Sequence, residues 1–541
     1  LLFKSQICRR WIRLQKGQPG SLWRASYLIW MHSLLGNRMS DSQNPKKQLR
    51  GGNSKRAMGE LHRRAFLLSS ACGLGGVALN HMLAGASSGP DGFSTLARPP
   101  HFAPTAKRCI FVFMAGAPSQ LDLFDYKPML NQYDGKPLPD SMTEGVRFAF
   151  LQKDSARLMG TKRTFKRRGQ SGMWFSDLLP HLATRADDLC MIQSMHTDQF
   201  NHHPGQLMMQ CGQAQFGLPS MGSWVSYGLG SENQDLPSYV VLTSGRGSSG
   251  GSTLWNHGFL PSIHGGVLFR NQGTPILNLD RPSGWSKEMD RHLLDALDEV
   301  NRHHWENKQD PEIISRIANY EMAFRMQMAA PELVDLTREP DHVRTAYGVD
   351  RPEPEKRSGR VGSGDHFASF ATNCLLARRL VERGVRFVNL VFASWDHHSN
   401  LDAELAYNAT CVDQPMAALI GDLKERGLLD ETLVVWAGEF GRTPLGENRV
   451  GRAGVTGRDH HPNAFSLFMA GGGVRGGHVH GETDDFGWAP VKDAVHINDL
   501  QATLLHLFGL DHQRLTYRHH GADMRLTSVT RKARAIRSLL A

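Results

Sequence analysis

Continuous apolar runs of strand length recur along the chain from residue 108 onward. A polar or glycine-containing turn follows each run, which is typical of strands buried on both faces of a parallel sheet. The pattern predicts strands over Arg108–Met114, Leu189–Met195, Tyr239–Leu242, Val385–Phe392, Thr432–Ala437 and Phe465–Met469.

Segments with apolar residues at helical spacing lie between these runs. Met416, Leu419, Ile420 and Leu423 fall at i, i+3, i+4 and i+7 and form one apolar stripe. Strands that alternate with helices predict an α/β fold with a largely parallel central sheet flanked by helices. Helices are expected over Phe175–Ala186, Phe367–Arg383, Asp413–Arg426 and Leu500–Phe508, together with a charged helical insertion near residues 287–345.

The composition is that of a folded chain. With 541 residues it is long enough to bury a full core. At 40% hydrophobic and 21% charged residues, a disordered chain and a protein of many membrane spans are both excluded. The 7 cysteines are scattered and form no Cys-x-x-Cys pair, which excludes a disulfide scaffold and a thiolate zinc knuckle.

Basic residues are concentrated at the front of the chain. The formal net charge is +10, from 62 Lys and Arg against 52 Asp and Glu. Residues 1–64 hold 14 Lys and Arg and 2 acidic residues, a net of +12, so that the remainder carries −2. A nucleic-acid binder carries its basic face on the folded body, and we therefore expect no nucleic-acid partner.

The segment after Met58 resembles a twin-arginine export signal. Arg63 and Arg64 precede Ala65-Phe66-Leu67-Leu68, and a short apolar run over residues 71–83 follows. This run is too short and too rich in glycine to span a membrane, and Ala84-Gly85-Ala86 provides a cleavage site. A short buried helix behind a basic tail is the alternative interpretation.

The predicted export signal, called here the leader, sets the expected boundaries along the chain. We expect translation to start at Met58, with residues 1–57 an untranslated or disordered extension and residues 58–86 the signal peptide. A linker over residues 87–106, the main domain over 107–530 and a tail over 531–541 then follow. The mature chain is expected outside the cytoplasm, periplasmic or secreted, and without a stable membrane span.

Acidic and imidazole side chains are grouped at the ends of the predicted strands. Asp396-His397-His398 follows one strand, Glu439 and Arg442 follow another, and Asp459-His460-His461 precedes the strand at Phe465. Chemistry collects at the carboxyl ends of parallel strands, and a divalent metal needs three or more convergent ligands. Solvated turns and an ordinary Glu–Arg ion pair are the alternatives for these groups.

The residues Asp430–Gly441 resemble the late metal-binding strand of the alkaline phosphatase and sulfatase superfamily, in which a strand ends in an acidic residue. The mature chain is more specifically similar to a twin-arginine-exported, sulfatase-like family, the domain-of-unknown-function family numbered 1501. The segments that carry this similarity are residues 114–125, 394–398, 438–444, 457–462 and 525–527. The resemblance implies an α/β sandwich with a metal-centred site for phosphate or sulfate esters.

The chain departs from the superfamily at three places. Gly116 and Ala117 stand where the first strand usually ends in a metal-binding Asp, His202 falls near the place of the nucleophile, and Phe440 replaces the second late ligand. We therefore expect one divalent ion, zinc, calcium or manganese, held by some of Asp396, His398, Glu439, Asp459 and His460.

The leading hypothesis is an exported metal-dependent hydrolase of sulfate or phosphate esters, acting on an anionic substrate such as a sulfated or phosphorylated glycan. Arg442 would stabilise the developing charge, and His202 would act as general acid/base or as covalent nucleophile. Ser119 is a further nucleophile candidate. The alternative is a hydrolase-like scaffold that binds a glycan or a protein and has no turnover, because the usual nucleophile and first-strand Asp are missing.

Overall fold

The computed structural model describes residues 96–144, 151–245, 247–270, 276, 281, 283–354, 365–447 and 456–541. The predicted leader and the extension before it lie outside the described residues. Among the described helices, none combines the length and the apolar character needed to cross a bilayer.

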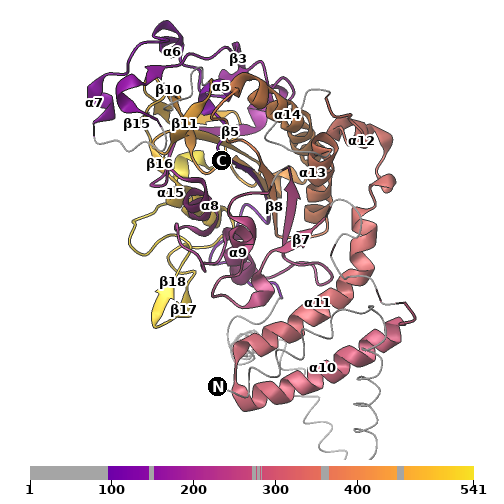
Figure 1. The fold of residues 1–541 in the computed structure, drawn as a ribbon. Coiled ribbons are helices and arrows are strands. Elements are labelled where there is room, and N and C mark those ends of the chain that lie inside the picture. The colour runs from indigo at the N-terminus through magenta and orange to yellow at the C-terminus, as the bar shows by residue number, and fades with distance from the viewer. Residues whose placement is uncertain are drawn as a thin grey trace, which may run out of the picture. The chain divides into compact units, whose positions relative to one another are not determined.

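A mixed, mostly parallel sheet forms the centre of the described chain (Figure 1). Eight of its nine described strands follow one another across the sheet, and β16 (Val495–His496) pairs with β5 beside this path. In spatial order, the eight are β13 (His478–His480), β5 (Leu189–His196), β12 (Phe465–Ala470), β9 (Thr432–Ala437), β1 (Arg108–Ala115), β8 (Phe387–Ala393), β6 (Tyr239–Ser244) and β7 (Val267–Phe269).

The direction of β12 decides which loops meet. It runs antiparallel to both β5 and β9, whereas β9, β1, β8 and β6 are parallel to one another. The start of β12 therefore lies at the same sheet edge as the carboxyl ends of its neighbours. Two loops that follow parallel strands and the segment that precedes β12 thus reach one edge.

Helices cover both faces of the sheet (Figure 1). The β1 side chains alternate, so that Ile110 and Val112 pack with α13 (His366–Glu382) and α14 (Leu401–Glu425). Phe111 and Phe113 point to the other face and pack with α8, α9 and α15. The bounds of these three helices are His202–Cys211, Met221–Leu229 and Ile497–Leu507. This double burial explains the continuous apolar runs in the sequence.

Smaller elements complete the described chain. A three-stranded sheet joins β11 (Arg458–His461), β10 (Gly441–Gly446) and β2 (Arg157–Leu158), next to the main sheet edge. The charged helices α10 (Lys287–Lys308), α11 (Pro311–Val334) and α12 (Asp341–Tyr347) occupy the predicted insertion. The remaining elements are α5 (Gln120–Leu123), α6 (Pro128–Gln132), α7 (Asp140–Thr143), β3 (Phe165–Arg168), β4 (Met173–Ser176), β14 (Glu482–Thr483), β15 (Pro490–Lys492), β17 (Tyr517–His519) and β18 (Ala522–Met524).

The six predicted strands are present, but two predictions about them and the helices are wrong. The run at Phe465 forms the antiparallel β12 and not a parallel strand. The helix expected over Phe175–Ala186 is replaced by β4 and a 3-10 turn over Leu182–Asp188. Phe175 pairs with Lys166 across a hairpin, and Pro180, which lacks an N–H donor, separates the two elements.

Candidate metal centre

Five segments that are distant in the sequence meet at the sheet edge. Gly116 follows β1, the Asp396–His398 loop follows β8, and Glu439 follows β9. His202 is the first residue of α8, which comes after β5, and His460 lies on β11 immediately before β12. The topology of the sheet thus brings together side chains that stand up to 258 positions apart, as His202 and His460 do.

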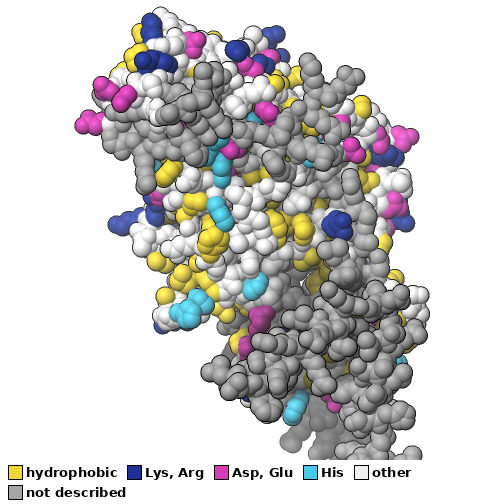
Figure 2. All heavy atoms as spheres, viewed as in Figure 1, with side chains coloured by type: hydrophobic (Ala, Val, Ile, Leu, Met, Phe, Trp, Pro, Cys, Tyr) yellow, Lys and Arg dark blue, Asp and Glu magenta, His cyan; other side chains and the backbone are white. Residues whose placement is uncertain are grey.

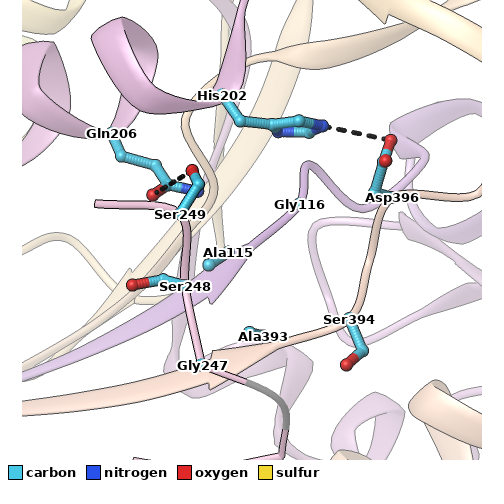
Figure 3. A pocket seen from close by; sticks show the side chains of 10 residues that line it. All are labelled: Ala115, Gly116, His202, Gln206, Gly247, Ser248, Ser249, Ala393, Ser394 and Asp396. Carbon is cyan, nitrogen blue, oxygen red and sulfur yellow. Dashed lines mark hydrogen bonds and ion pairs between the residues drawn. The ribbon is translucent and has the colours of Figure 1, made fainter. Parts of the chain in front are cut away.

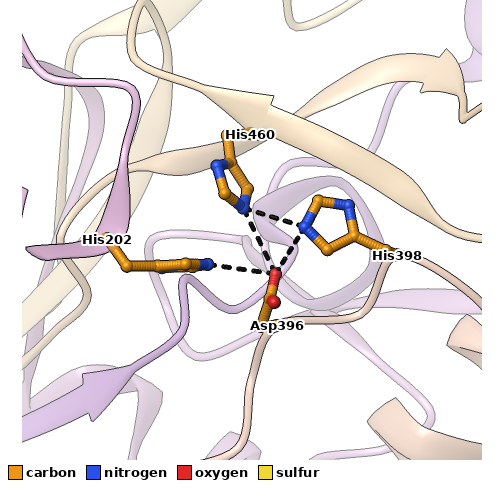
Figure 4. Close-up of side chains that lie close together, drawn as sticks. All are labelled: His202, Asp396, His398 and His460. Carbon is orange, nitrogen blue, oxygen red and sulfur yellow. Dashed lines mark hydrogen bonds and ion pairs between the residues drawn. The ribbon is translucent and has the colours of Figure 1, made fainter. Parts of the chain in front are cut away.

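Three imidazole nitrogens converge on one carboxylate oxygen (Figure 4). Asp396 Oδ1 lies 3.1 Å from His202 Nε2, 2.8 Å from His398 Nε2 and 3.2 Å from His460 Nε2. The Nε2 atoms of His398 and His460 are 3.0 Å apart. The four groups, called here the metal-ligand cluster, each offer one ligand atom, and these atoms lie within 4.8 Å of one another.

The other ring nitrogen of each imidazole faces an acceptor. His202 Nδ1 lies 2.7 Å from Glu439 Oε1, and His460 Nδ1 lies 2.8 Å from the carbonyl oxygen of Phe200. His398 Nδ1 contacts a carboxylate oxygen of Glu447. These partners favour a hydrogen on each Nδ1, so that Nε2 is the atom each ring directs at the centre of the cluster.

Two glycines allow the close approach of the backbone segments. Gly116 has φ +113°, and a Cβ there would lie 2.7 Å from the backbone nitrogen of Asp396. A Cβ on Gly457 would lie 2.1 Å from the carbonyl carbon of His398. Side chains at either position would push apart the loops that carry Asp396, His398 and His460.

Arg442 connects Asp396 of the cluster to the backbone of neighbouring segments. Its guanidinium Nη2 lies 2.7 Å from Asp396 Oδ1, and its Nε and Nη1 donate to the carbonyl oxygens of Ala117 and Arg458. The side chain is 1% exposed. Its donors are thus committed to the protein, and the predicted grip on a substrate oxyanion has no geometric counterpart here.

The pKa values reflect these contacts. Burial opposes ionisation of Asp396, but Arg442 and the three imidazoles hold the pKa of its carboxyl far below the ordinary range. Burial also lowers the pKa of His202, but the carboxylates of Asp396 and Glu439 outweigh it and raise the pKa to about 9. Burial and the positive charge of Arg442 lower the pKa of His460 to about 3.

The remaining predicted site residues lie around the cluster. Glu439 is fully buried and contacts His202 Nδ1. Asp459 accepts from the backbone N–H groups of Leu151 and His460, and with His398 and Glu447 it forms a second group of potential ligand atoms. Ser119 donates to Asp122 and does not line the pocket described below.

Only one histidine of each Asp-His-His sequence enters the cluster. His397 contacts the amide of Asn408 on α14, and His461 faces the carbonyl oxygen of Trp488. On β11, side chains of adjacent residues point in opposite directions, which explains the separation of His460 and His461. Phe440 packs its ring on His202 and His460, with centroids 5.2 and 4.8 Å away.

A pocket of about 200 Å³ opens beside the cluster (Figure 3). His202 and Asp396 form one side, and small residues of the loop after β6 form another. The described residues that line it include no Lys or Arg; they are Ala115, Gly116, His202, Gln206, Gly247, Ser248, Ser249, Ala393, Ser394 and Asp396. Among the described residues on the face shown in Figure 2, Lys and Arg are interspersed with Asp and Glu and form no single basic patch.

Sequence reasoning missed two residues of the site. Glu447, 2% exposed, holds His398 from the side opposite Asp396. Gln206, also 2% exposed, lies one helical turn after His202 and contacts Glu439. The i, i+4 spacing of His202 and Gln206 is a readable signal, since such residues share one face of a helix. Glu447 carries no such signal.

The comparisons with known proteins give one family. No curated protein matches the chain. The similar solved structures include the lipoteichoic acid synthase LtaP from Listeria monocytogenes, at 8% identity over 81% of this chain and 79% of that chain, with a TM-score of 0.34. The PsFucS1 sulfatase from Pseudoalteromonas sp. has 11% identity over 75% and 68%, with a TM-score of 0.32.

A protein in the alkaline phosphatase superfamily from Vibrio parahaemolyticus has 10% identity over 78% of this chain and 72% of that chain, with a TM-score of 0.31. The family model described as "Protein of unknown function (DUF1501)" matches residues 106–540. That match covers the whole described sheet and every residue of the metal-ligand cluster. The chain therefore belongs to the DUF1501 family.

Proposed function

We propose that the protein is an exported, metal-dependent hydrolase of sulfate or phosphate esters. The observation that carries the proposal is the convergence of His202, His398 and His460 on Asp396 Oδ1. A cation at the centre would take the place of the proton that Asp396 and Glu439 stabilise on His202, and with hydrogens on the three Nδ1 atoms each of the four groups would offer it a lone pair.

The donor set supports a transition metal or zinc. Imidazole nitrogens suit zinc, iron, copper and nickel, whereas calcium takes six to eight oxygen ligands. Three imidazoles and one carboxylate therefore favour zinc over calcium and manganese among the three ions that the sequence suggests. His202 Nε2 lies 3.1 Å from Asp396 Oδ1, and a bound ion would replace this contact with one bond to each of the two atoms.

Each residue then has a defined task. His202, Asp396, His398 and His460 would hold the ion, which when bound supplies a Lewis acid for an ester oxygen or water. Glu439 and Glu447 hold two of the imidazoles in the ligand tautomer. Arg442 keeps Asp396 in place and stabilises its negative charge. In this proposal His202 is a metal ligand and not a nucleophile.

The choice of substrate rests on the resemblance of Asp430–Gly441 to the alkaline phosphatase and sulfatase superfamily and on the pocket. The Asp396 and His202 side chains form the boundary between the cluster and the pocket. An ester whose anionic group binds the metal could place its alcohol part beside the hydroxyl groups of Ser248 and Ser249. These neutral polar groups suit a sugar alcohol, and we propose a sulfated or phosphorylated glycan.

Metal analysis with a substrate screen tests the proposal. Purified protein is expected to contain about one transition metal or zinc ion per chain and to hydrolyse aryl sulfate or aryl phosphate esters. His398→Gln is expected to lose both, whereas His397→Gln, whose imidazole contacts Asn408, keeps both. Absence of metal from the wild-type protein refutes the proposal. Tight metal binding without turnover favours the non-catalytic scaffold.

Export by the twin-arginine route is part of the same proposal and rests on Arg63 and Arg64. The test compares the full chain with an Arg63→Lys, Arg64→Lys double variant in a bacterium with a working twin-arginine pathway. We expect the first to reach the periplasm and the second to stay in the cytoplasm. Equal export of the full chain and the double variant would refute the proposal of twin-arginine export.

A further inference from the structure

Gln206 connects the wall of the pocket with the metal-ligand cluster through consecutive hydrogen bonds. Its Nε2 donates to Glu439 Oε1 at 3.1 Å, and Glu439 Oε1 lies 2.7 Å from His202 Nδ1. On the other side, Gln206 Oε1 accepts from Ser249 Oγ at 3.0 Å and from the backbone N–H of Gly250 at 2.9 Å. One amide thus contacts both the loop and the carboxylate that holds a metal ligand.

The contacts fix the orientation of this amide. The backbone N–H of Gly250 is a donor and must face the oxygen Oε1, whereas the carboxylate of Glu439 accepts from Nε2. Gln206 is 2% exposed and lies on the same face of α8 as His202, one turn later (Figure 3). Rotation of the amide would leave the Gly250 N–H without its acceptor and would turn Gln206 Oε1, itself an acceptor, toward the Glu439 carboxylate.

Glu439 has little freedom of its own. The carboxylate is fully buried, and its Oε1 also accepts from the backbone N–H of Gly116 at 2.9 Å. Gly116 and Gln206 therefore determine where Glu439 lies, and Glu439 determines the ring orientation and tautomer of His202. Partners of this kind in the outer shell of a metal site typically change metal affinity by about 10–100-fold when removed.

We propose that Gln206 is a positioning residue that couples the loop over residues 247–250, whose residues 247–249 line the pocket, to the metal affinity of the cluster. The amide holds Glu439, and through it His202, in the arrangement that binds the ion. The same amide holds the loop, so that metal binding and ordering of the loop favour each other. Coupling of this kind is reciprocal by thermodynamic necessity. The inference rests on the proposed metal binding and not on turnover.

The test measures metal binding directly, with Zn²⁺ affinity determined by chelator competition and the Co²⁺ absorption spectrum as a record of ligand geometry. We expect Gln206→Met, which keeps the volume of the side chain, to weaken Zn²⁺ binding by about 10–100-fold and to alter the Co²⁺ spectrum. Ser249→Ala is expected to weaken binding by a smaller factor, because it removes one of two donors to Gln206.

Gln210→Met is the matched control. Gln210 lies on the same helix one turn further, is fully buried, and accepts from Asn389 away from the cluster. It should reproduce any loss of stability from burying methionine in α8 and leave the Zn²⁺ affinity and Co²⁺ spectrum unchanged. Equal affinities and spectra for Gln206→Met and wild type would overturn the inference, as would equal effects of the two variants.

Hydrogen exchange provides a second measurement on the wild-type fold. Zn²⁺ is expected to slow exchange of the Gly250 amide in the wild-type protein and to have little effect in Gln206→Met. Metal-independent exchange at Gly250 in the wild-type protein would contradict the coupling. Failure of the wild-type protein to bind any metal would instead refute the proposed metal site, which distinguishes the two outcomes.

Discussion

Two buried polar clusters in this protein each place a carboxylate among nitrogen-containing side chains, but the two differ in what they can bind. In the metal-ligand cluster, Asp396 faces three imidazoles and one guanidinium. In a second cluster, called here the arginine cluster, Glu339 faces two guanidiniums, with Arg378 Nη2 at 2.5 Å and Arg379 Nη1 at 2.6 Å. Arg378 also contacts Asp422 and Glu382, at 3.0 and 2.6 Å.

The difference lies in the partner of the carboxylate. A guanidinium stays protonated and offers only donors, so the arginine cluster is complete without a further group. A neutral imidazole whose Nδ1–H is already donated offers a lone pair, so that the metal-ligand cluster presents acceptors to one point. A buried carboxylate alone therefore does not show whether a cluster is a structural ion pair or a metal site. The partner of the carboxylate, guanidinium or imidazole, shows which of the two it is.

The largest expected effect on stability belongs to the arginine cluster. Glu339→Gln removes the charge that Arg378 and Arg379 share, and we expect the free energy of unfolding to fall by about 3–5 kcal/mol. Urea denaturation measures this loss. Zn²⁺ affinity should stay at the wild-type value, and a parallel loss of metal affinity would break the distinction between the clusters.

Metal removal is expected to destabilise the protein through the metal-ligand cluster alone. At a free Zn²⁺ concentration of about 100 times Kd, binding to the folded state adds about 2.7 kcal/mol to the free energy of unfolding. A chelator should abolish this gain in the wild-type protein and in Glu339→Gln. In His398→Gln, chelator and Zn²⁺ should leave the unfolding midpoint unchanged; a shift there would mean that the ion binds elsewhere.

Glu447 sharpens the comparison within the metal-ligand cluster. Glu447→Gln keeps the shape of the side chain but weakens the acceptor for His398 Nδ1, and we expect metal affinity to fall by about 10–100-fold. Asp422→Asn in the arginine cluster is the control, with metal affinity unchanged. Chelator competition measures both. Should Glu447→Gln abolish metal binding altogether, Glu447 would be a ligand and not a positioning residue.

A buried imidazole away from both clusters gives the smallest expected effect. Burial, aided by the charge of Arg531, lowers the pKa of His496 to about 4. The unfolded chain binds this proton near pH 6.5 and the folded chain only near pH 4, so stability falls as the pH drops through that window. Between pH 7 and 5 the loss is about 1–2 kcal/mol.

His496→Asn should remove that pH dependence. His496 Nδ1 caps α15 by accepting from the backbone N–H of Asn498 at 3.1 Å, and Asn caps helices equally well. Urea unfolding at pH 7 and pH 5 compares the variant with the wild-type protein. An unchanged pH dependence in the variant would place the effect on another group.

The strands were the most predictable part of the fold. The apolar runs at Arg108, Val385 and Thr432 needed no tertiary information, because burial on both faces requires apolar residues at every position. The helix predicted over Phe175–Ala186 was wrong because contacts with distant segments decide the structure there. The spacing of this segment fits a helix, but Phe175 pairs with Lys166 in a hairpin. The backbone N–H groups of His181 and Leu182 donate to Asp413 at the start of the 3-10 turn.

The candidate site was predictable in its residue types and less so in its geometry. The sequence places Asp396, His398 and His460 in polar groups at strand ends, and the structure brings them together. It does not reveal which histidine of each pair turns inward, because a shift of one residue along an extended segment reverses the side chain. The sequence also does not reveal that Glu439 contacts His202 Nδ1, or that Arg442 is engaged by Asp396 and by backbone carbonyl oxygens.

The sequence by itself determined the class of fold and the chemical character of one sheet edge, because hydrophobic periodicity and the types of titratable residues are local properties. Only the tertiary structure decided which atoms meet. The antiparallel direction of β12 brings His460 to the carboxyl ends of β8 and β9, and α8 brings His202 and Gln206 to the same point. Convergence of several distant segments on one atom depends on strand order and direction, and no short stretch of sequence contains that information.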